Sequence, residues 1–228
     1  MTSIYIDIET VPSQPEEETK AEIAKTIEAP AQMKKAETIA EWHNGAGKYA
    51  GVKDAAIEEA YRKGALDGAK GEIISIAFSD GDEMLCEYRL KSYKEEDLLS
   101  NVFYTIEELC EKKQHKSQPY FIGHNVSWDL KFIWHRSVIL GIKPPFKLPF
   151  GGKHKSDYYD NMQAWAGYNQ RISQDNLAKA LGIPGKPDDI DGSNVWTHVK
   201  AGNVGRVAEY NKYDVETVIE IYNRINFK

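Results

Sequence analysis

Strict alternation of apolar and polar positions opens the chain. Positions 4, 6 and 8 are isoleucine, and the alternate positions 5, 7 and 9 carry Tyr5, Asp7 and Glu9. A period of two residues is typical of a β-strand, whose successive side chains point to opposite faces. The pattern therefore predicts a strand over 3–10 with one apolar face and one face that carries two carboxylates.

Three further segments have the character of strands. Residues 72–79 and 83–90 flank the turn sequence Asp80-Gly81-Asp82. An Asp-Gly pair between such segments is a strong signal for a hairpin, so we expect an antiparallel pair of strands here. The apolar run at 119–123 is short enough to be a buried strand.

Apolar residues recur at helical spacing between and after these strands. The predicted helices lie within 93–113, between the strand at 119–123 and Leu140, from Ser173 to Gly182, and at about 204–225. Strands interleaved with helices predict the α/β class. We expect a mixed sheet, with an antiparallel hairpin and parallel strands, flanked by helices.

A charged, alanine-rich stretch separates the first strand from the hairpin. It reaches from about residue 13 to residue 71, and glycines interrupt its helical spacing. We interpret it as a helical insertion within one domain that comprises residues 1–228. Its size leaves open the docking of a protein partner.

Composition and cysteine content limit the location of the protein. No apolar segment of the 228 residues approaches the length of about 20 residues that a membrane helix needs. The first residues lack the basic and apolar regions of a secretory signal. Cys86 and Cys110 have no metal-ligand spacing and suit a reducing compartment. We expect no membrane partner and a cytoplasmic location, either in a bacterial cell or, for a phage-encoded protein, in the host cytoplasm.

The formal net charge of −6 argues against a protein that binds phosphate through a uniformly basic surface. An acidic site that first collects cations is compatible with that charge, because the cations can then bind phosphate. Asp7 and Glu9, on one face of the first predicted strand, are candidates for such a site. Their carboxylates would be costly side by side without a divalent ion, although such a pair also arises by chance.

Two other segments carry polar residues at suggestive spacing. Asn125 and Asp129 follow the predicted strand at 119–123, where ligands often bind, but taken alone they are more typical of the start of a helix. Tyr210 and Asp214 lie four residues apart on one face of the last predicted helix. A surface tyrosine beside a solvated aspartate is the alternative interpretation.

Taken together, these motifs resemble those of the DEDD superfamily of 3′–5′ exonucleases, in the same order along the chain. Asp7-Ile8-Glu9-Thr10 resembles the first motif, Asn125-x-x-x-Asp129 the second and Tyr210-x-x-x-Asp214 the third. The histidine branch has His five residues before the last Asp, where this chain has Glu209. Tyr210 is typical of the tyrosine branch, which includes the proofreading domains of family-B DNA polymerases and their stand-alone relatives. The segment 181–186 is also similar, and the resemblance omits only the insertion.

The resemblance implies a ribonuclease H-like fold and hydrolysis of phosphodiester bonds from the 3′ end, with release of nucleoside 5′-monophosphates. It also implies two divalent ions, Mg²⁺ or Mn²⁺. The implied metal ligands are Asp7, Glu9, Asp129 and Asp214. Tyr210 would orient the nucleophile, and the implied substrate contacts are Asn125, Thr10 and Lys186.

Single-stranded DNA 3′ ends are the expected substrate, because no polymerase region accompanies the motifs. The alternatives are an exoribonuclease of the same fold and a non-catalytic module that binds nucleic acid. A basic loop is a candidate for contact with the nucleic-acid strand, and the alternative is a loop that is only solvated. The basic residues of this loop are Lys143, Lys147, Lys153, His154 and Lys155. Asp157 and Asp160 match no motif and are interpreted as structural.

Overall fold

The computed structural model describes residues 1–45, 47–90, 92–113, 118–185 and 189–228. Contacts divide the chain into two compact units. One unit comprises Met1–Thr10 and Ile73–Lys228, and the other comprises Val11–Glu72. The single domain with an insertion at about 13–71 stays a prediction.

A five-stranded mixed sheet has the order β3-β2-β1-β4-β5. Its strands are β1 (Thr2–Pro12), β2 (Gly71–Ser79), β3 (Met84–Tyr88), β4 (Pro119–Gly123) and β5 (Tyr159–Asp160). Strands β2 and β3 form the antiparallel hairpin, whereas β4 pairs in parallel with both β1 and β5. The sheet and its flanking helices confirm the predicted α/β class and agree with a ribonuclease H-like fold.

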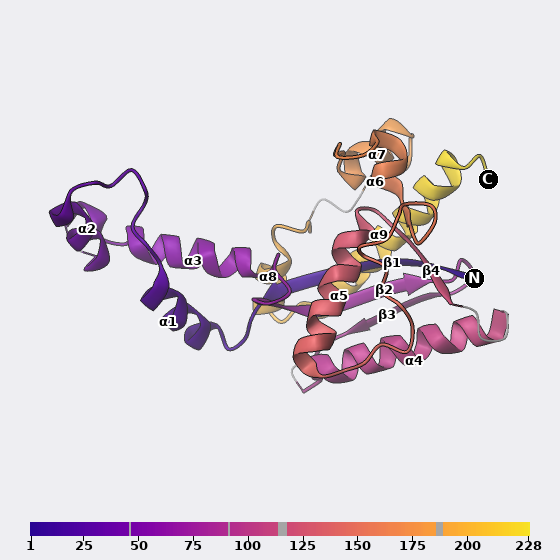
Figure 1. Ribbon diagram of the computed structural model, residues 1–228, viewed down its shortest axis with the longest axis horizontal. Helices are drawn as coiled ribbons and strands as arrows, with labels where there is room; N and C mark the ends of the chain where they lie inside the picture. Colours follow the sequence, from indigo (N-terminus) through magenta and orange to yellow (C-terminus); the bar gives the residue numbers. More distant parts are fainter. Residues whose placement is uncertain (46, 91, 114–117, 186–188) are drawn as a thin grey trace. The chain divides into compact units, whose positions relative to one another are not determined.

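Helices cover both faces of the sheet. They are α4 (Glu95–Lys113), α5 (Val126–Leu140), α6 (Asn161–Ala166), α7 (Gln174–Ala180), α8 (Val195–Lys200) and α9 (Val204–Ile225). The isoleucines of β1 share one apolar core with α4 and α5, whereas Tyr5 shares another with Val215 and Val218 of α9. Figure 1 accordingly shows α5 in front of the strands and α9 behind them.

The helix starting after Ser173 illustrates how local sequence sets an element. The Ser173 side chain accepts a hydrogen bond from the Asn176 N–H and so caps α7, as its sequence predicts. Gly182, just beyond the helix, has φ +69°, which favours a residue without a side chain. Gln174, the first residue of this helix, contacts the acidic site described below.

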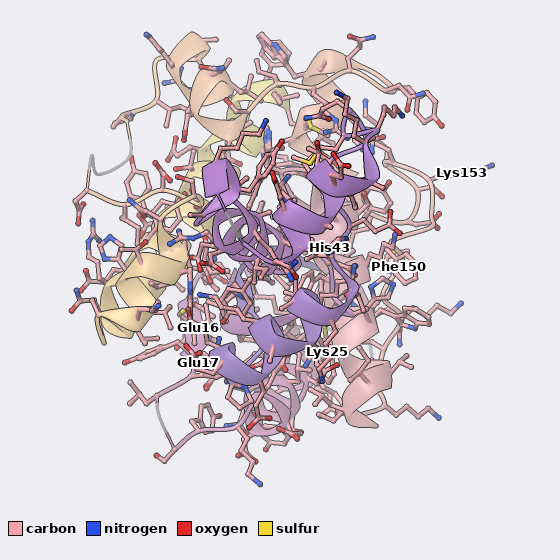
Figure 2. The ribbon with its side chains drawn as sticks, turned by 90° about the vertical axis from the view of Figure 1, so that its left-hand side faces the viewer. Glu16, Glu17, Lys25, His43, Phe150 and Lys153 are labelled. Carbon is pink, nitrogen blue, oxygen red and sulfur yellow. The ribbon has the colours of Figure 1, made fainter. Side chains whose placement is uncertain are left out.

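The unit Val11–Glu72 is helical, in agreement with the helical pattern of its sequence. It contains α1 (Glu16–Thr26), α2 (Ala36–His43), the 3₁₀ turn Gly47–Tyr49 and α3 (Val52–Gly64). Helix α1 has no buried residue, and it packs against α3. Figure 2 shows Glu16 and Glu17 toward one end of α1 and Lys25 toward the other, an arrangement that complements the helix dipole.

The apolar centre of this unit is small. Trp42 of α2 and Tyr61 of α3 are its fully buried large side chains among the described residues. Throughout the described part of the chain, the helices are either too short or too polar to cross a lipid bilayer.

Candidate metal centre

Three acidic side chains from distant parts of the sequence meet beside the sheet. Asp7 and Glu9 come from β1 and Asp214 from the middle of α9, and one oxygen of each lies within 4.8 Å of the others. Glu9 is 8% exposed and Asp214 is 5% exposed, whereas Asp7 is half-buried. The structure thus brings together three of the four carboxylates implied as metal ligands.

Strand geometry explains why β1 presents these acids. Alternate side chains point to opposite faces, so Asp7 and Glu9 share the face of Tyr5, which packs against α9. Ile6 and Ile8 point the other way, into the core with α4 and α5. On α9, Asp214 lies one turn beyond Tyr210, which is also buried.

The fourth predicted acid, Asp129, reaches the same region from the first turn of α5. Gly123, at the end of β4, allows a tight junction, since a Cβ at that position would lie 3.0 Å from the Ile6 carbonyl oxygen. Asp129 is 5% exposed, and its carboxylate accepts a hydrogen bond from the Ile8 N–H. It does not belong to the group whose oxygens are mutually within 4.8 Å, but it lies close enough to Asp214 for their charges to interact.

The charge state of Asp129 reflects this environment. Burial raises the pKa of its carboxyl well above the usual range, and the negative charges of Asp160 and Asp214 raise it further. The N–H groups of Ile8 and of Asp129 itself act in the opposite direction. An ionised Asp129 therefore calls for a cation nearby.

Two amide side chains hold the acids in place. Asn211 donates from Nδ2 to Asp7 Oδ2 at 2.7 Å, and Gln174 donates from Nε2 to Asp214 Oδ1 at 3.0 Å. Sequence reasoning identified neither residue. Asn211 lies in the apolar stripe of α9, and a polar residue at such a position is a signal of a buried partner.

Asp160 has a structural role, as the sequence analysis interpreted it. Its charge also raises the pKa of Asp129, which the sequence analysis did not predict. Asp160 is fully buried, and its Oδ1 accepts from the N–H groups of Met162 and Asn125. It thereby caps α6 and fixes the start of α5. Asp157 is also structural, since its Oδ2 accepts from the Lys153 N–H at 2.6 Å.

The residues predicted to contact substrate occupy different settings. Asn125 is exposed, with φ 62°, at the junction of β4 and α5. Thr10 is half-buried, and strand alternation turns its side chain to the face opposite Glu9. Lys186 lies outside the described residues. Substrate contact by these three residues stays a prediction.

The basic loop divides into outward and inward residues. Lys143, Lys147, Lys153 and Lys155 are exposed, and Figure 2 shows the Lys153 side chain extending outward. His154 instead accepts a hydrogen bond from the Asp160 N–H on Nδ1 at 3.1 Å, and its ring lies 5.1 Å from that of Tyr159. These contacts are those of a residue that supports the loop. They differ from the contact with a nucleic-acid strand that was predicted for His154.

The donor chemistry of the cluster fits a hard divalent cation. The three close groups offer carboxylate oxygens alone, which are the ligands that Mg²⁺ and Mn²⁺ favour. A cation at this position would offset the mutual repulsion of the acids and the desolvation of Asp129.

Comparison with known families agrees with this geometry. The model of a family described as "predicted 3′–5′ exonuclease related to the exonuclease domain of PolB" matches residues 72–227. A search of curated proteins found no match. The matched segment contains Asp129, Tyr210 and Asp214, and the fold adds Asp7 and Glu9 from outside it. The chain belongs to this family of predicted 3′–5′ exonucleases related to the exonuclease domain of PolB.

Proposed function

We propose that the protein is a metal-dependent 3′–5′ exonuclease that acts on single-stranded DNA and releases nucleoside 5′-monophosphates. The observation that supports this proposal is the convergence of Asp7, Glu9 and Asp214, with oxygens within 4.8 Å, in a member of an exonuclease family. Net negative charge is no obstacle, because the acids lie where cations are needed.

Asp7, Glu9 and Asp214 would hold two divalent ions, Mg²⁺ or Mn²⁺, with Asp129 as the fourth acid. Bound there, the ions supply activation of water and stabilisation of the charge that develops on the phosphate. The carboxylates position that chemistry against the terminal phosphodiester. Burial of Glu9, Asp129 and Asp214 limits their contact with bulk water, which strengthens electrostatic interactions within the site.

Tyr210 would orient the attacking water. An ordinary tyrosine has a pKa of about 10, so its hydroxyl is neutral at pH 7. Such a hydroxyl is better suited to hydrogen-bond the water than to remove a proton from it. Its position on α9, one turn before Asp214, suits this role. The exposed lysines of the loop would attract the phosphates of the strand.

Degradation of a 5′-labelled oligonucleotide with Mg²⁺ or Mn²⁺ tests the proposal. Single-stranded DNA should shorten progressively from its 3′ end, faster than duplex DNA or RNA. Asp7→Ala should lower the rate by about a thousandfold or more, since an ion supplies several kcal/mol of transition-state stabilisation. Asp54→Ala, at an exposed acid of α3, is the matched control and should leave the rate unchanged.

Other outcomes would favour the alternatives. Full activity of Asp7→Ala would refute the assigned site. Faster cleavage of RNA would indicate an exoribonuclease, and tight binding without cleavage under either ion would indicate a non-catalytic module. Docking of a protein partner by the insertion at about 13–71 stays a prediction, which a pull-down with and without that segment would test.

A further inference from the structure

A fully buried amide lies between the sheet and α9, directly beside the acidic cluster. Asn211 is 0% exposed, and its Nδ2 donates to Asp7 Oδ2 at 2.7 Å. Its Oδ1 accepts from the hydroxyl of Ser75, a buried residue of β2, at 2.8 Å. Asn211 therefore connects Asp7 on β1 to the neighbouring strand.

The direction of these hydrogen bonds is fixed by the number of hydrogens. A serine hydroxyl carries one hydrogen, and Ser75 gives it to Asn211. In the 3.2 Å contact between Ser75 Oγ and Cys86 Sγ, a hydrogen would then have to come from the thiol, which also lies 3.9 Å from the Glu87 carbonyl oxygen and 3.8 Å from that of Ala208. Burial raises the pKa of the Cys86 thiol, which keeps it protonated at neutral pH.

This chain of donors locks the Asn211 side chain in one orientation. A flipped amide would place its oxygen against the Asp7 carboxylate and its NH₂ group against the Ser75 hydroxyl. The contact of the amide oxygen with the carboxylate would be repulsive, and the hydrogen bond from Ser75 to Oδ1 would be lost. The donor to Asp7 is also neutral, so it orients the carboxylate without competing with a cation for its charge, as a lysine would.

We propose that Asn211 is a positioning residue that holds Asp7 in the orientation in which Asp7, Glu9 and Asp214 share a divalent ion. The inference rests on the proposed metal site. Groups that hydrogen-bond to metal ligands commonly set ligand orientation, and their loss lowers metal affinity by about 10–100-fold.

A second buried asparagine provides a matched control. Asn161 is also 0% exposed and also contacts α9, but its Nδ2 donates to the Val218 carbonyl oxygen at 2.9 Å. Asn161→Ala and Asn211→Ala therefore remove the same amide from comparable packing. Of these two asparagines, Asn211 is the one that donates to Asp7.

The experiment measures Mn²⁺ affinity directly, by electron paramagnetic resonance of free Mn²⁺, and stability by urea unfolding in EDTA. Both variants should unfold at lower urea concentration. Asn211→Ala should weaken Mn²⁺ binding by about 10–100-fold, whereas Asn161→Ala should bind like wild type. Equal weakening in the two variants would overturn the inference, because it would indicate a general effect of instability.

Ser75→Ala supplies a test that does not depend on folding of Asn211→Ala. It keeps the amide but removes the hydrogen that locks it, so a smaller loss of Mn²⁺ affinity is expected, about three- to tenfold. Wild-type affinity in Ser75→Ala would overturn the positioning role. In the same assay, Asp7→Ala should lose binding; if it retained wild-type affinity, the metal site itself would be wrong.

Discussion

An exposed ion-pair network in one compact unit of the chain contrasts with a buried ion pair in the other. In Val11–Glu72, Glu58 pairs with Lys20 and Arg62, whose side chains are 23% and 48% exposed. In the other unit, Arg136 and Glu95 form a pair whose side chains are 9% and 4% exposed. Solvent screens the first set, whereas the second depends on direct compensation by its partners.

The buried carboxylates of the chain differ in whether a positive charge lies beside them. The Glu95 carboxylate accepts hydrogen bonds from Arg136, from Nε at 3.0 Å and from Nη2 at 2.7 Å, and from the Ile73 N–H at 2.8 Å. The amides of Asn211 and Gln174 are neutral, so they orient the acids of the metal centre without cancelling their charge. The difference indicates where the fold is prepared to receive a cation.

Breaking one ion pair in each unit should give the largest contrast in stability. Arg136→Ala leaves the Glu95 carboxylate buried without its partner and should lower the free energy of unfolding by about 3–5 kcal/mol. Arg62→Ala, in the exposed network, should cost about 1 kcal/mol or less. Urea unfolding followed by tryptophan fluorescence measures both, and equal costs would contradict the distinction between the exposed network and the buried pair.

Asp129 should make the stability of the protein depend on pH. Its pKa is raised in the folded state, so its contribution to stability is full below the unfolded value of about 3.9 and is lost as pH rises through the folded pKa. In EDTA, Asp129→Asn should therefore melt at a higher temperature than wild type at neutral pH.

The same two proteins should melt alike near pH 4, and Mg²⁺ should raise the melting temperature of wild type more than that of Asp129→Asn. Thermal unfolding from about pH 4 to pH 8 tests both expectations. A difference in melting temperature that stays constant with pH would rule out titration of Asp129 as its cause.

The smallest effect is expected from Lys20→Ala in the unit Val11–Glu72. Lys20 contacts Glu16 and Glu58, and its ammonium lies 5.0 Å from the centre of the Tyr61 ring. The variant should lower the free energy of unfolding by about 1 kcal/mol or less. The decrease should be smaller still in about 1 M salt, because salt screens exposed charges. Urea unfolding at low and high salt measures this change. The variant should bind Mn²⁺ like wild type, because Lys20 lies outside the unit that contains the acidic cluster, and a changed Mn²⁺ affinity would contradict this expectation.

Local signals explain how much of the fold the sequence predicted. Strand β1, the hairpin of β2 and β3, and helix α9 lie where alternation, turn residues and helical spacing indicate them. Strand β5 has two residues and exists only through its pairing with β4, so its sequence carries no periodic signal. Helix α8, with six residues, is likewise too short for a periodicity to be detected.

The site follows the same division. Its acids were predicted from motif resemblance, because their spacing along the chain is characteristic. Gln174 and Asn211 were missed, since the value of an amide depends on which neighbour the folded chain supplies. The inward orientation of His154 also depends on a tertiary contact, its hydrogen bond with the Asp160 backbone.

The hydrogen bond between Asn211 and Asp7 joins residues 204 positions apart. During synthesis, Asp7 and Glu9 leave the ribosome first, and the helix that carries their partners leaves among the last segments of this sequence. A nascent or prematurely terminated chain that lacks α9 thus lacks an assembled cluster. Synthesis in this order would leave the acidic cluster incomplete until translation of this region is nearly finished.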